Sequence, residues 1–443
     1  MEIMNKAIRI QLLDFKSPQM RAFHVTWFAF FLCFFGWFGI APLMAVVRDD
    51  LHLTKTQIGN TIIASVAITI LFRLIIGRLC DRIGPRLAYT WLLILGSLPV
   101  MGIGLSNSYE TFLLFRLAIG AIGASFVITQ YHTSVMFAPN CVGTANATTA
   151  GWGNLGGGVT QMVMPLIFAA FLSLGIDKFL SWRLSMVVPG ALLFLTGIGY
   201  YFLTQDAPNG NYKELREKGE LPPANDGQHG SFMLAAKDYR VWALFVVYAA
   251  CFGVELTINN IAALYYYDQF SLDLETAGLI ASLFGLMNIF ARTLGGVYSD
   301  RFAAKFGLKG RVSLLFAVLL LEGLALIVFS QMSILFTAVT SMIVFSLFVQ
   351  MSEGATYGVV PFVNKKALGS VAGIVGAGGN AGAVAAGFLF RAESLSTQQG
   401  LMYLGILVVI ASGFALLVRF SPEVVAEEKE ALQQALAQRA VAN

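Results

Sequence analysis

Charged residues are scarce in this chain. Only 12% of its 443 residues are charged, whereas about a quarter of the residues of an average soluble protein are. Hydrophobic residues make up 57% of the sequence. A soluble domain with this composition could not cover its own surface with polar groups. The composition therefore excludes an ordinary soluble enzyme and a disordered chain, and it favours a protein with many membrane-spanning segments.

Cysteine is also rare, and its pattern excludes two further classes. The four cysteines form no C-x-x-C pair and lie in or beside apolar runs, at Cys33, Cys80, Cys141 and Cys251. They indicate neither a disulfide scaffold nor a metal centre. The four histidines are too scattered to form a set of ligands, and the apolar segments contain no nucleotide-binding loop and no Ser/His/Asp grouping. We therefore predict no enzyme activity, no cofactor and no metal.

Long apolar runs dominate what is present. A bilayer-spanning helix needs about 20 apolar residues, and the runs here lack the alternation of barrel strands. We predict an all-α membrane protein with twelve transmembrane helices in two pseudo-symmetric six-helix halves. The predicted spans are residues 24–46, 57–80, 87–106, 111–137, 143–172, 184–204, 240–266, 275–299, 312–331, 333–361, 367–391 and 401–420.

The longest polar stretch follows the sixth span and divides the chain. The predicted order is an amphipathic N-terminus resembling a surface helix (1–23), the first half (24–204), a linker (205–239), the second half (240–420) and a tail (421–443). With the N-terminus inside, 21 of the 29 lysines and arginines fall in inner segments and 5 in outer ones. Basic loops stay on the cytoplasmic side. We therefore expect a multi-pass protein of the plasma (inner) membrane with both termini, the linker and the tail in the cytoplasm.

One motif occurs twice, at the end of the second span of each half. An arginine is followed by glycine at +4 and by Asp-Arg at +8 and +9, and the copies are 219 residues apart. The residues are Arg73, Gly77, Asp81 and Arg82, then Arg292, Gly296, Asp300 and Arg301. The G-x-x-x-D-R ending resembles the signature loop of the major facilitator superfamily. Glycine would let helices approach, and Asp-Arg would clamp a helix end, so these residues would have a conformational role. The alternative is that the motif is a loop whose basic residues only follow the inside-positive bias.

A second repeat lies in the fifth span of each half. Both copies contain Gly-Asn-x-Gly, with Gly153 and Asn154 in the first and Gly379 and Asn380 in the second, 226 residues apart. Glycines in such number indicate close approach, either of helix to helix or of backbone to a ligand. An amide within hydrocarbon needs polar partners, which favours a binding role for the two asparagines over packing alone.

The motif arginines lie deep in their spans. Arg73 and Arg292 are each about seven residues, or ~10 Å, from the predicted inner helix end, where a charge costs at least ~2.5–3.5 kcal/mol. A wet cavity that receives an anion would resolve this cost, and the planar guanidinium fork suits a planar monovalent oxyanion. Arg116, in the fourth span, has no second-half copy and is expected to be structural or gating. The alternative for the motif arginines is an ion pair with a glutamate within the spans, namely Glu255, Glu322 or Glu353.

The two glycine-rich strings carry a family resemblance. AGWGNLGGG at 150–158 and GIVGAGGNAGAV at 373–384 resemble the paired signatures of the nitrate/nitrite porter family, closest to the high-affinity nitrate transporters of plants, algae and cyanobacteria. The resemblance covers the whole transmembrane chain. It implies that Arg73, Arg292, Asn154 and Tyr248 hold the anion, and that aromatic rings sandwich it, namely Phe34, Phe126 and Phe252. Ala150 departs from the exchanger branch, which has glycine there.

The resemblance implies a secondary active transporter that imports nitrate and nitrite with protons, by alternating access around the two arginines. Glu255 is the first candidate for the proton-coupling residue because it shares a helix face with Tyr248 and Phe252. Glu322, Glu353 and His132 are the weaker candidates. Nitrate, nitrite, protons and the lipid bilayer are the expected partners, nucleic acid is not, and an accessory subunit is not predictable. The alternatives are a nitrate/nitrite exchanger, which needs no proton residue, and a major facilitator carrier for another small anion, which should carry a further basic group.

Overall fold

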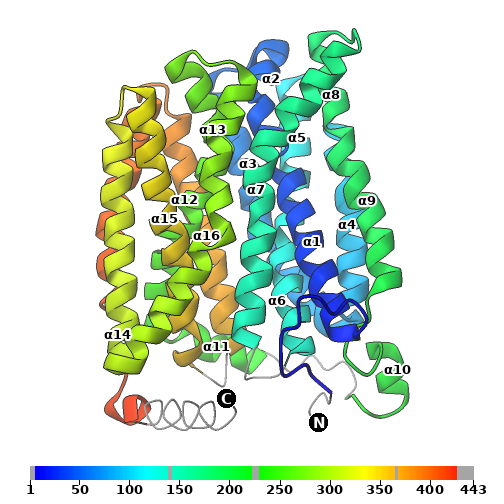
Figure 1. The fold of residues 1–443 in the computed structure, drawn as a ribbon, viewed down its shortest axis with the longest axis vertical. Coiled ribbons are helices and arrows are strands. Elements are labelled where there is room, and N and C mark those ends of the chain that lie inside the picture. The colour runs from blue at the N-terminus through cyan, green and yellow to red at the C-terminus, as the bar shows by residue number, and fades with distance from the viewer. Residues whose placement is uncertain (1–4, 138–141, 222–228, 365–367, 427–443) are drawn as a thin grey trace. The chain divides into compact units, whose positions relative to one another are not determined.

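Helices form the regular structure of the protein. The computed structural model describes residues 5–137, 142–221, 229–364 and 368–426 (Figure 1). Within these residues, twelve helical segments are long and apolar enough to cross a membrane, which confirms the predicted all-α membrane fold. They are Pro18–Leu51, Lys55–Arg73, Pro85–Leu105, Tyr109–Met136, Thr144–Ser173, Lys178–Leu203, Tyr239–Phe270, Leu274–Ala303, Lys305–Ser330, Leu335–Val359, Ser370–Arg391 and Thr397–Ala415.

The chain divides into two compact units. Unit 1 comprises Met1–Gly227, Glu255–Ile289 and Ala383–Gly400, and unit 2 comprises Gln228–Val254, Phe290–Gly382 and Leu401–Asn443. Wholly in unit 1 are α1 (Pro18–Phe38), α2 (Met44–Leu51), α3 (Lys55–Ile83), α4 (Pro85–Gly102), α5 (Tyr109–Ile119), α6 (Ser125–Met136), α7 (Val142–Ser173), α8 (Lys178–Ser185), α9 (Val187–Leu203), α10 (Tyr212–Glu217) and α13 (Leu274–Leu286). Unit 2 holds α11 (His229–Ala236), α14 (Ala291–Ser330) and α15 (Leu335–Val359), while α12 (Tyr239–Phe270), α16 (Leu368–Arg391) and α17 (Thr397–Ala415) are divided between the units.

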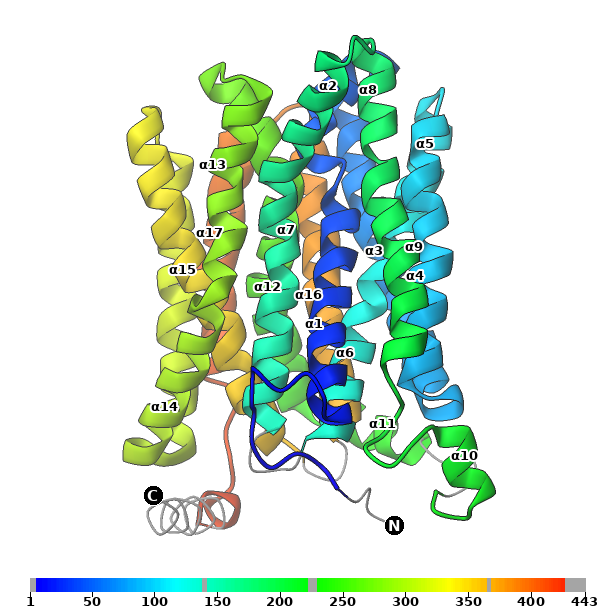
Figure 2. The same cartoon turned by 45° about the vertical axis from the view of Figure 1, so that its right-hand side comes forward.

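Glycines set the close helix pairs of unit 1. α1 lies beside α7, and α4 lies beside α9 (Figures 1 and 2). A Cβ at Gly156 of α7 would overlap the carbonyl oxygen of Phe31 on α1. A Cβ at Gly190 of α9 would overlap the side chain of Met101 on α4. The small residues therefore allow the backbones to approach more closely than any side chain would permit.

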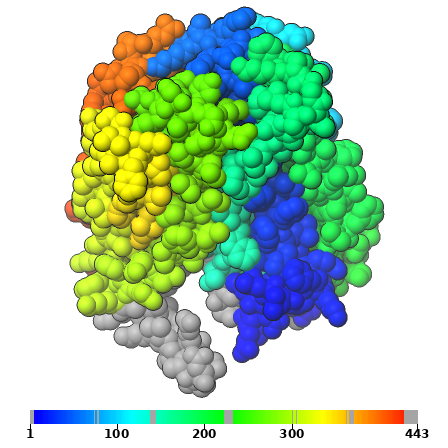
Figure 3. Space-filling model, turned by 45° about the horizontal axis from the view of Figure 1, so that its top comes forward, coloured from blue at the N-terminus to red at the C-terminus, as the bar shows by residue number. Residues whose placement is uncertain are grey.

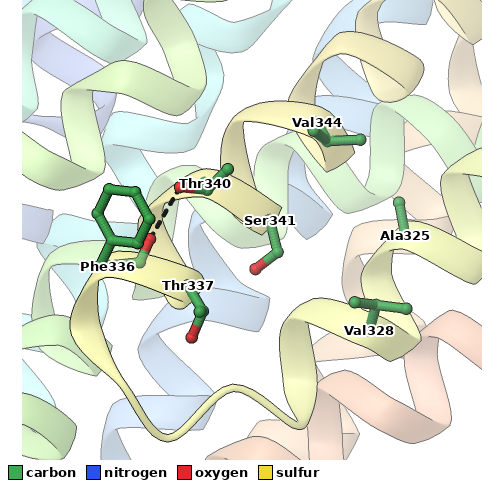
Figure 4. Close-up of a pocket in the computed structure, with 7 residues that line it drawn as sticks. All are labelled: Ala325, Val328, Phe336, Thr337, Thr340, Ser341 and Val344. Carbon is green, nitrogen blue, oxygen red and sulfur yellow. Dashed lines mark hydrogen bonds between the residues drawn. The ribbon is translucent and has the colours of Figure 1, made fainter.

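The hairpin of α14 and α15 forms much of unit 2, and the two helices lie side by side. α14 contains the end of the span Leu274–Ala303 and all of the span Lys305–Ser330, and its backbone leaves the helical conformation at Gly307, where φ is 63°. Glycine populates positive φ without steric cost, so this position suits the junction between two spans. A groove between the ends of these helices is lined by Ala325, Val328, Phe336, Thr337, Thr340, Ser341 and Val344 (Figure 4). It contains no charged side chain, so it lacks the chemistry of an anion site.

The N-terminal segment differs from its prediction. Residues 5–17 are not helical, so the predicted surface helix is wrong over this stretch. The Asp14 carboxylate accepts hydrogen bonds from the backbone N–H groups of Lys16 and Ser17, and α1 begins immediately afterwards with Ser17 as N-cap and Pro18 in its first turn. Proline suits the first turn of a helix because its missing N–H has no partner to lose. Figure 3 shows the segment in dark blue against the face of unit 1, where Ala7 and Ile10 pack against a buried cluster that includes Phe23 and Phe137.

Candidate functional site

The first motif arginine lies beside an aromatic cluster in unit 1. Arg73 of α3 is 7% exposed, and its guanidinium carbon is 5.3 Å from the ring centroid of Phe126 on α6. Phe30 of α1 connects Phe126 to Phe34, with centroid separations of 6.0 and 4.9 Å. The structure therefore brings together three residues that the resemblance named. A cation beside ring faces is stabilised by about 0.5–2 kcal/mol.

The second motif arginine lies in a cluster of unit 2. Arg292 of α14 is 4% exposed, and its Nη2 donates to the Tyr248 hydroxyl at 3.2 Å. Its Nη1 forms an ion pair with Oε2 of Glu353 on α15, at 2.5 Å. The ring of Tyr248 stacks on Phe252, with centroids 5.2 Å apart. Three predicted site residues therefore meet here, and the ion-pair alternative considered from the sequence is realised for Arg292, with Glu353 as the partner.

The signature asparagine of unit 1 belongs to a carboxylate–amide group. Both oxygens of the buried Glu255 accept hydrogen bonds, Oε2 from Nδ2 of Asn154 at 3.2 Å and Oε1 from Nδ2 of Asn288 at 2.8 Å. Asn288 was missed by sequence reasoning, although an amide within an apolar run is itself the signal that could have indicated it. Asn154 and Glu255, predicted for separate roles, thus contact each other.

The other signature asparagine has a different environment. Asn380 of α16 is fully buried in unit 2. Within the part of the chain that the structure describes, neither its amide nitrogen nor its amide oxygen has a hydrogen-bond partner. A buried amide without a partner costs about 1–3 kcal/mol. Asn380 is therefore a group that a polar ligand could satisfy.

The signature glycines each face an aromatic ring. A Cβ at Gly153 would overlap the ring of Phe30, and a Cβ at Gly379 would overlap the ring of Phe252. The two contacts occupy corresponding places in the two sequence repeats. Phe30 is therefore the counterpart of Phe252. It was not selected from the sequence, because only its position opposite Gly153 distinguishes it among the 36 phenylalanines.

These contacts predict that two glycines of α16 tolerate alanine differently. A Cβ at Gly382 would overlap the carbonyl oxygen of Ala249, whereas a Cβ at Gly373 would meet no atom of the described residues within 4 Å. We expect Gly382→Ala to destabilise the protein by about 1–3 kcal/mol through overpacking, and Gly373→Ala to leave stability unchanged or slightly raised. Thermal unfolding of the purified variants in detergent measures both, and equal midpoints for the two variants would refute the packing assigned to α16.

The conformational motif is only partly described. Gly77, Asp81 and Asp300 fall outside the residues whose side chains the structure describes. The exposed Arg301 lies over the ring of Tyr298, 5.6 Å from its centroid. A Cβ at Gly296 would meet no atom of the described residues within 4 Å, although a Cβ at Gly354 of α15 would lie 3.1 Å from the backbone nitrogen of Gly296. The neighbouring Gly295 faces the carbonyl oxygen of Met351 on α15.

A buried carboxylate fixes the loop after the first motif copy. Asp206 accepts hydrogen bonds from the backbone N–H groups of Arg86, at the start of α4, and Tyr212, at the start of α10. Burial raises the pKa of Asp206 above its ordinary value, while these two hydrogen bonds act in the opposite direction. Gly84 has φ of 88° and faces this carboxylate. Asp206 was missed because nothing in its sequence context distinguishes it from other linker carboxylates.

Arg116 has the structural contacts expected of it. It is fully buried in unit 1, and it donates to Oδ1 of Asn260 at 2.8 Å and to the carbonyl oxygen of Trp37 at 3.3 Å. It therefore ties α5 to α12 and to the end of α1.

Comparisons with known proteins show the family of the chain. Residues 26–387 match the Major Facilitator Superfamily. The chain is 41% identical to "High affinity nitrate transporter 2.5" of Arabidopsis thaliana, over 92% of this chain and 81% of that protein. It is 39% identical to "High-affinity nitrate transporter 2.3" of Oryza sativa subsp. japonica, over 94% of this chain and 80% of that protein. It is 29% identical to "Nitrate/nitrite transporter NrtP" of Nostoc punctiforme, over 83% of this chain and 86% of that protein.

A solved structure shares the fold. A bacterial homologue of the human lysosomal transporter Spinster, in an inward-facing and unoccupied conformation, has a TM-score of 0.71 to this chain. It is 17% identical, and the match covers 92% of this chain and 99% of that one. At this identity the likeness concerns the fold alone. Taken with the family match and the relatives, it completes the assignment: the chain belongs to the major facilitator superfamily and, within it, to the nitrate/nitrite porter family of the high-affinity nitrate transporters.

Proposed function

We propose that the protein is a secondary active transporter that imports nitrate, and also nitrite, across the plasma membrane with protons. The names of its relatives support the cargo. The observation that carries the proposal is the pair of buried arginines at repeat-related positions, Arg73 and Arg292, each set among aromatic side chains. The strong inner bias of the basic residues supports cytoplasmic termini.

The chemistry of these groups suits a flat anion of single charge. Guanidinium is permanently charged and presents paired donors in one plane, which match two oxygens of a planar oxyanion. The Tyr248 hydroxyl, already hydrogen-bonded to Arg292, is placed to contact an anion held there. The amide of Asn380, which has no hydrogen-bond partner among the described residues, would supply a further donor in the same unit. Nearby ring faces exclude water, which strengthens each of these interactions.

Transport then requires that the anion favours one conformation over another. We infer alternating access by rocking of the two six-helix halves, the general scheme of this fold. A ligand shifts such an equilibrium only through its differential affinity for the two states. The proposed contacts of the anion with Arg73 and Arg292 would supply this difference in affinity.

Proton coupling is tested by uptake into proteoliposomes. We expect an inward proton gradient, imposed without internal nitrite, to stimulate uptake of labelled nitrate several-fold over the rate without a gradient. Collapse of the gradient with a protonophore should abolish the stimulation, and empty liposomes serve as the control. If uptake instead ignores the gradient and needs nitrite inside the vesicle, the protein is the nitrate/nitrite exchanger.

A further inference from the structure

Arg292 forms an ion pair with a second ionisable group, Glu353. The two side chains come from neighbouring helices, α14 and α15, and are almost completely buried, with exposures of 4% for Arg292 and 0% for Glu353. Nη1 of Arg292 lies 2.5 Å from Oε2 of Glu353. The predicted anion-binding group is therefore neutralised by a carboxylate in this structure.

Such a pair cannot accept an anion without a further change. A buried carboxylate is stable as an ion only while its cation is beside it. An anion at Arg292 would leave two negative charges facing one positive charge within a buried site. One proton on Glu353 removes the excess charge, because the neutral acid no longer needs the cation and frees the guanidinium edge for the anion.

We propose that Glu353 is the proton-binding residue that couples a proton to nitrate at Arg292. This inference rests on the proposed function. In the empty carrier the Glu353 carboxylate pairs with Arg292. When nitrate binds to the guanidinium, Glu353 takes up one proton, and the site stays neutral with one proton per nitrate. When nitrate leaves, the proton leaves as well and the ion pair forms again.

The groups around Glu353 support this assignment. Tyr248 and Cys251 of α12 lie close enough to interact electrostatically with Glu353, and Cys251 does so with Glu322 of α14 as well. Tyr357 lies one helical turn from Glu353 on α15, and its ring contacts that of Tyr248. Tyrosine and cysteine are neutral near pH 7. Among the groups named here, Arg292 is therefore the one with a positive charge that a bound nitrate would compensate.

Glu255, the residue predicted from the sequence, has a different setting. Its two oxygens accept hydrogen bonds from the neutral amides of Asn154 and Asn288. Arrival of an anion at an arginine would change no charge on those partners. Glu255 therefore has a weaker electrostatic link to the substrate than Glu353 has, and it serves as the competing candidate in the test.

The test measures nitrate affinity and proton uptake as a function of pH. In the purified wild type, nitrate should bind more tightly as the pH falls, by up to about tenfold per pH unit for one linked proton. An indicator dye in weakly buffered solution should register proton uptake when nitrate is added. In Glu353→Gln, whose side chain mimics the protonated acid, nitrate affinity should be independent of pH and proton uptake should fall by about one per nitrate. Nitrate counterflow should remain while stimulation by a proton gradient is lost.

The matched variants are Glu255→Gln and Glu322→Gln, which should keep the pH dependence of the wild type. Wild-type pH dependence in Glu353→Gln would overturn the proposal, as would its loss in Glu255→Gln alone. Should Glu353→Gln fail to fold, nitrate binding by the wild type without proton uptake at any pH would overturn the proposal equally. A wild type that binds no nitrate at all would instead contradict the proposed function, so the two failures are distinguishable.

Discussion

Replacing either motif arginine with lysine is expected to reduce nitrate counterflow in proteoliposomes sharply while leaving the protein folded. Lysine keeps the positive charge but loses the planar pair of donors. A hydrogen bond to a charged group contributes about 1.5–3 kcal/mol, so one lost contact at Arg73 or Arg292 should lower the apparent nitrate affinity about ten- to hundredfold. Counterflow of labelled nitrate at several concentrations measures this loss, and size-exclusion chromatography of the same samples reports folding.

Arg9→Lys is the matched control, because Arg9 is exposed and lies outside every span. It should transport like the wild type. Normal counterflow in both Arg73→Lys and Arg292→Lys would contradict the assignment of these residues to the anion. A loss in only one of them would confine binding to that arginine and its own cluster.

Replacement of Glu255 by leucine is expected to destabilise the protein strongly, whereas glutamine should be tolerated. Leucine removes the acceptor of two buried amide donors, those of Asn154 and Asn288. Each donor left unsatisfied costs about 1–3 kcal/mol. Glutamine keeps one acceptor and adds a donor. The amide oxygens of both asparagines have no partner within the described chain, so one amide can rotate and accept from the new donor.

Thermal unfolding in detergent measures this difference, and the chain offers a matched control in Gln350 of α15. Gln350 is fully buried, and neither of its amide atoms has a hydrogen-bond partner in the described residues. Gln350→Leu should therefore leave stability unchanged or raise it, since no polar group loses a partner. A similar loss of stability in Gln350→Leu and Glu255→Leu would show that the lost hydrogen bonds of Glu255 are not the cause of the destabilisation in Glu255→Leu.

The twelve spans and the two motif arginines were predictable because the bilayer imposes simple rules. A spanning helix must be long and apolar, and a charge within it stands out against that background. The same rules made Glu255, Glu322 and Glu353 visible as candidates. They could not select Glu353 as the partner of Arg292, because that choice depends on how α14 packs against α15. Glycines determine this packing, and one of them is Gly354, which closely approaches the carbonyl oxygen of Arg292.

Other features were hidden for a related reason. Phe30 and Asn288 belong to common residue types within long apolar helices, so only the helix opposite each of them reveals what it contacts. Asp206 lies in a polar linker where carboxylates are ordinary, and its role at two helix starts depends on a turn of the chain. The N-terminal segment has the composition of a surface helix, yet it is not helical, and α1 begins only after it, with Ser17 as N-cap and Pro18 as its first residue. Local composition therefore predicted the membrane spans better than it predicted the contacts between residues of different helices.

The most direct test of the central claim is an electron cryo-microscopy map of the protein with saturating nitrate, compared with a map of the nitrate-free protein. We expect flat density within about 3 Å of the guanidinium group of Arg292, with Arg292 drawn away from Glu353. Density for nitrate at another place, with the Arg292–Glu353 pair unchanged, would contradict the account.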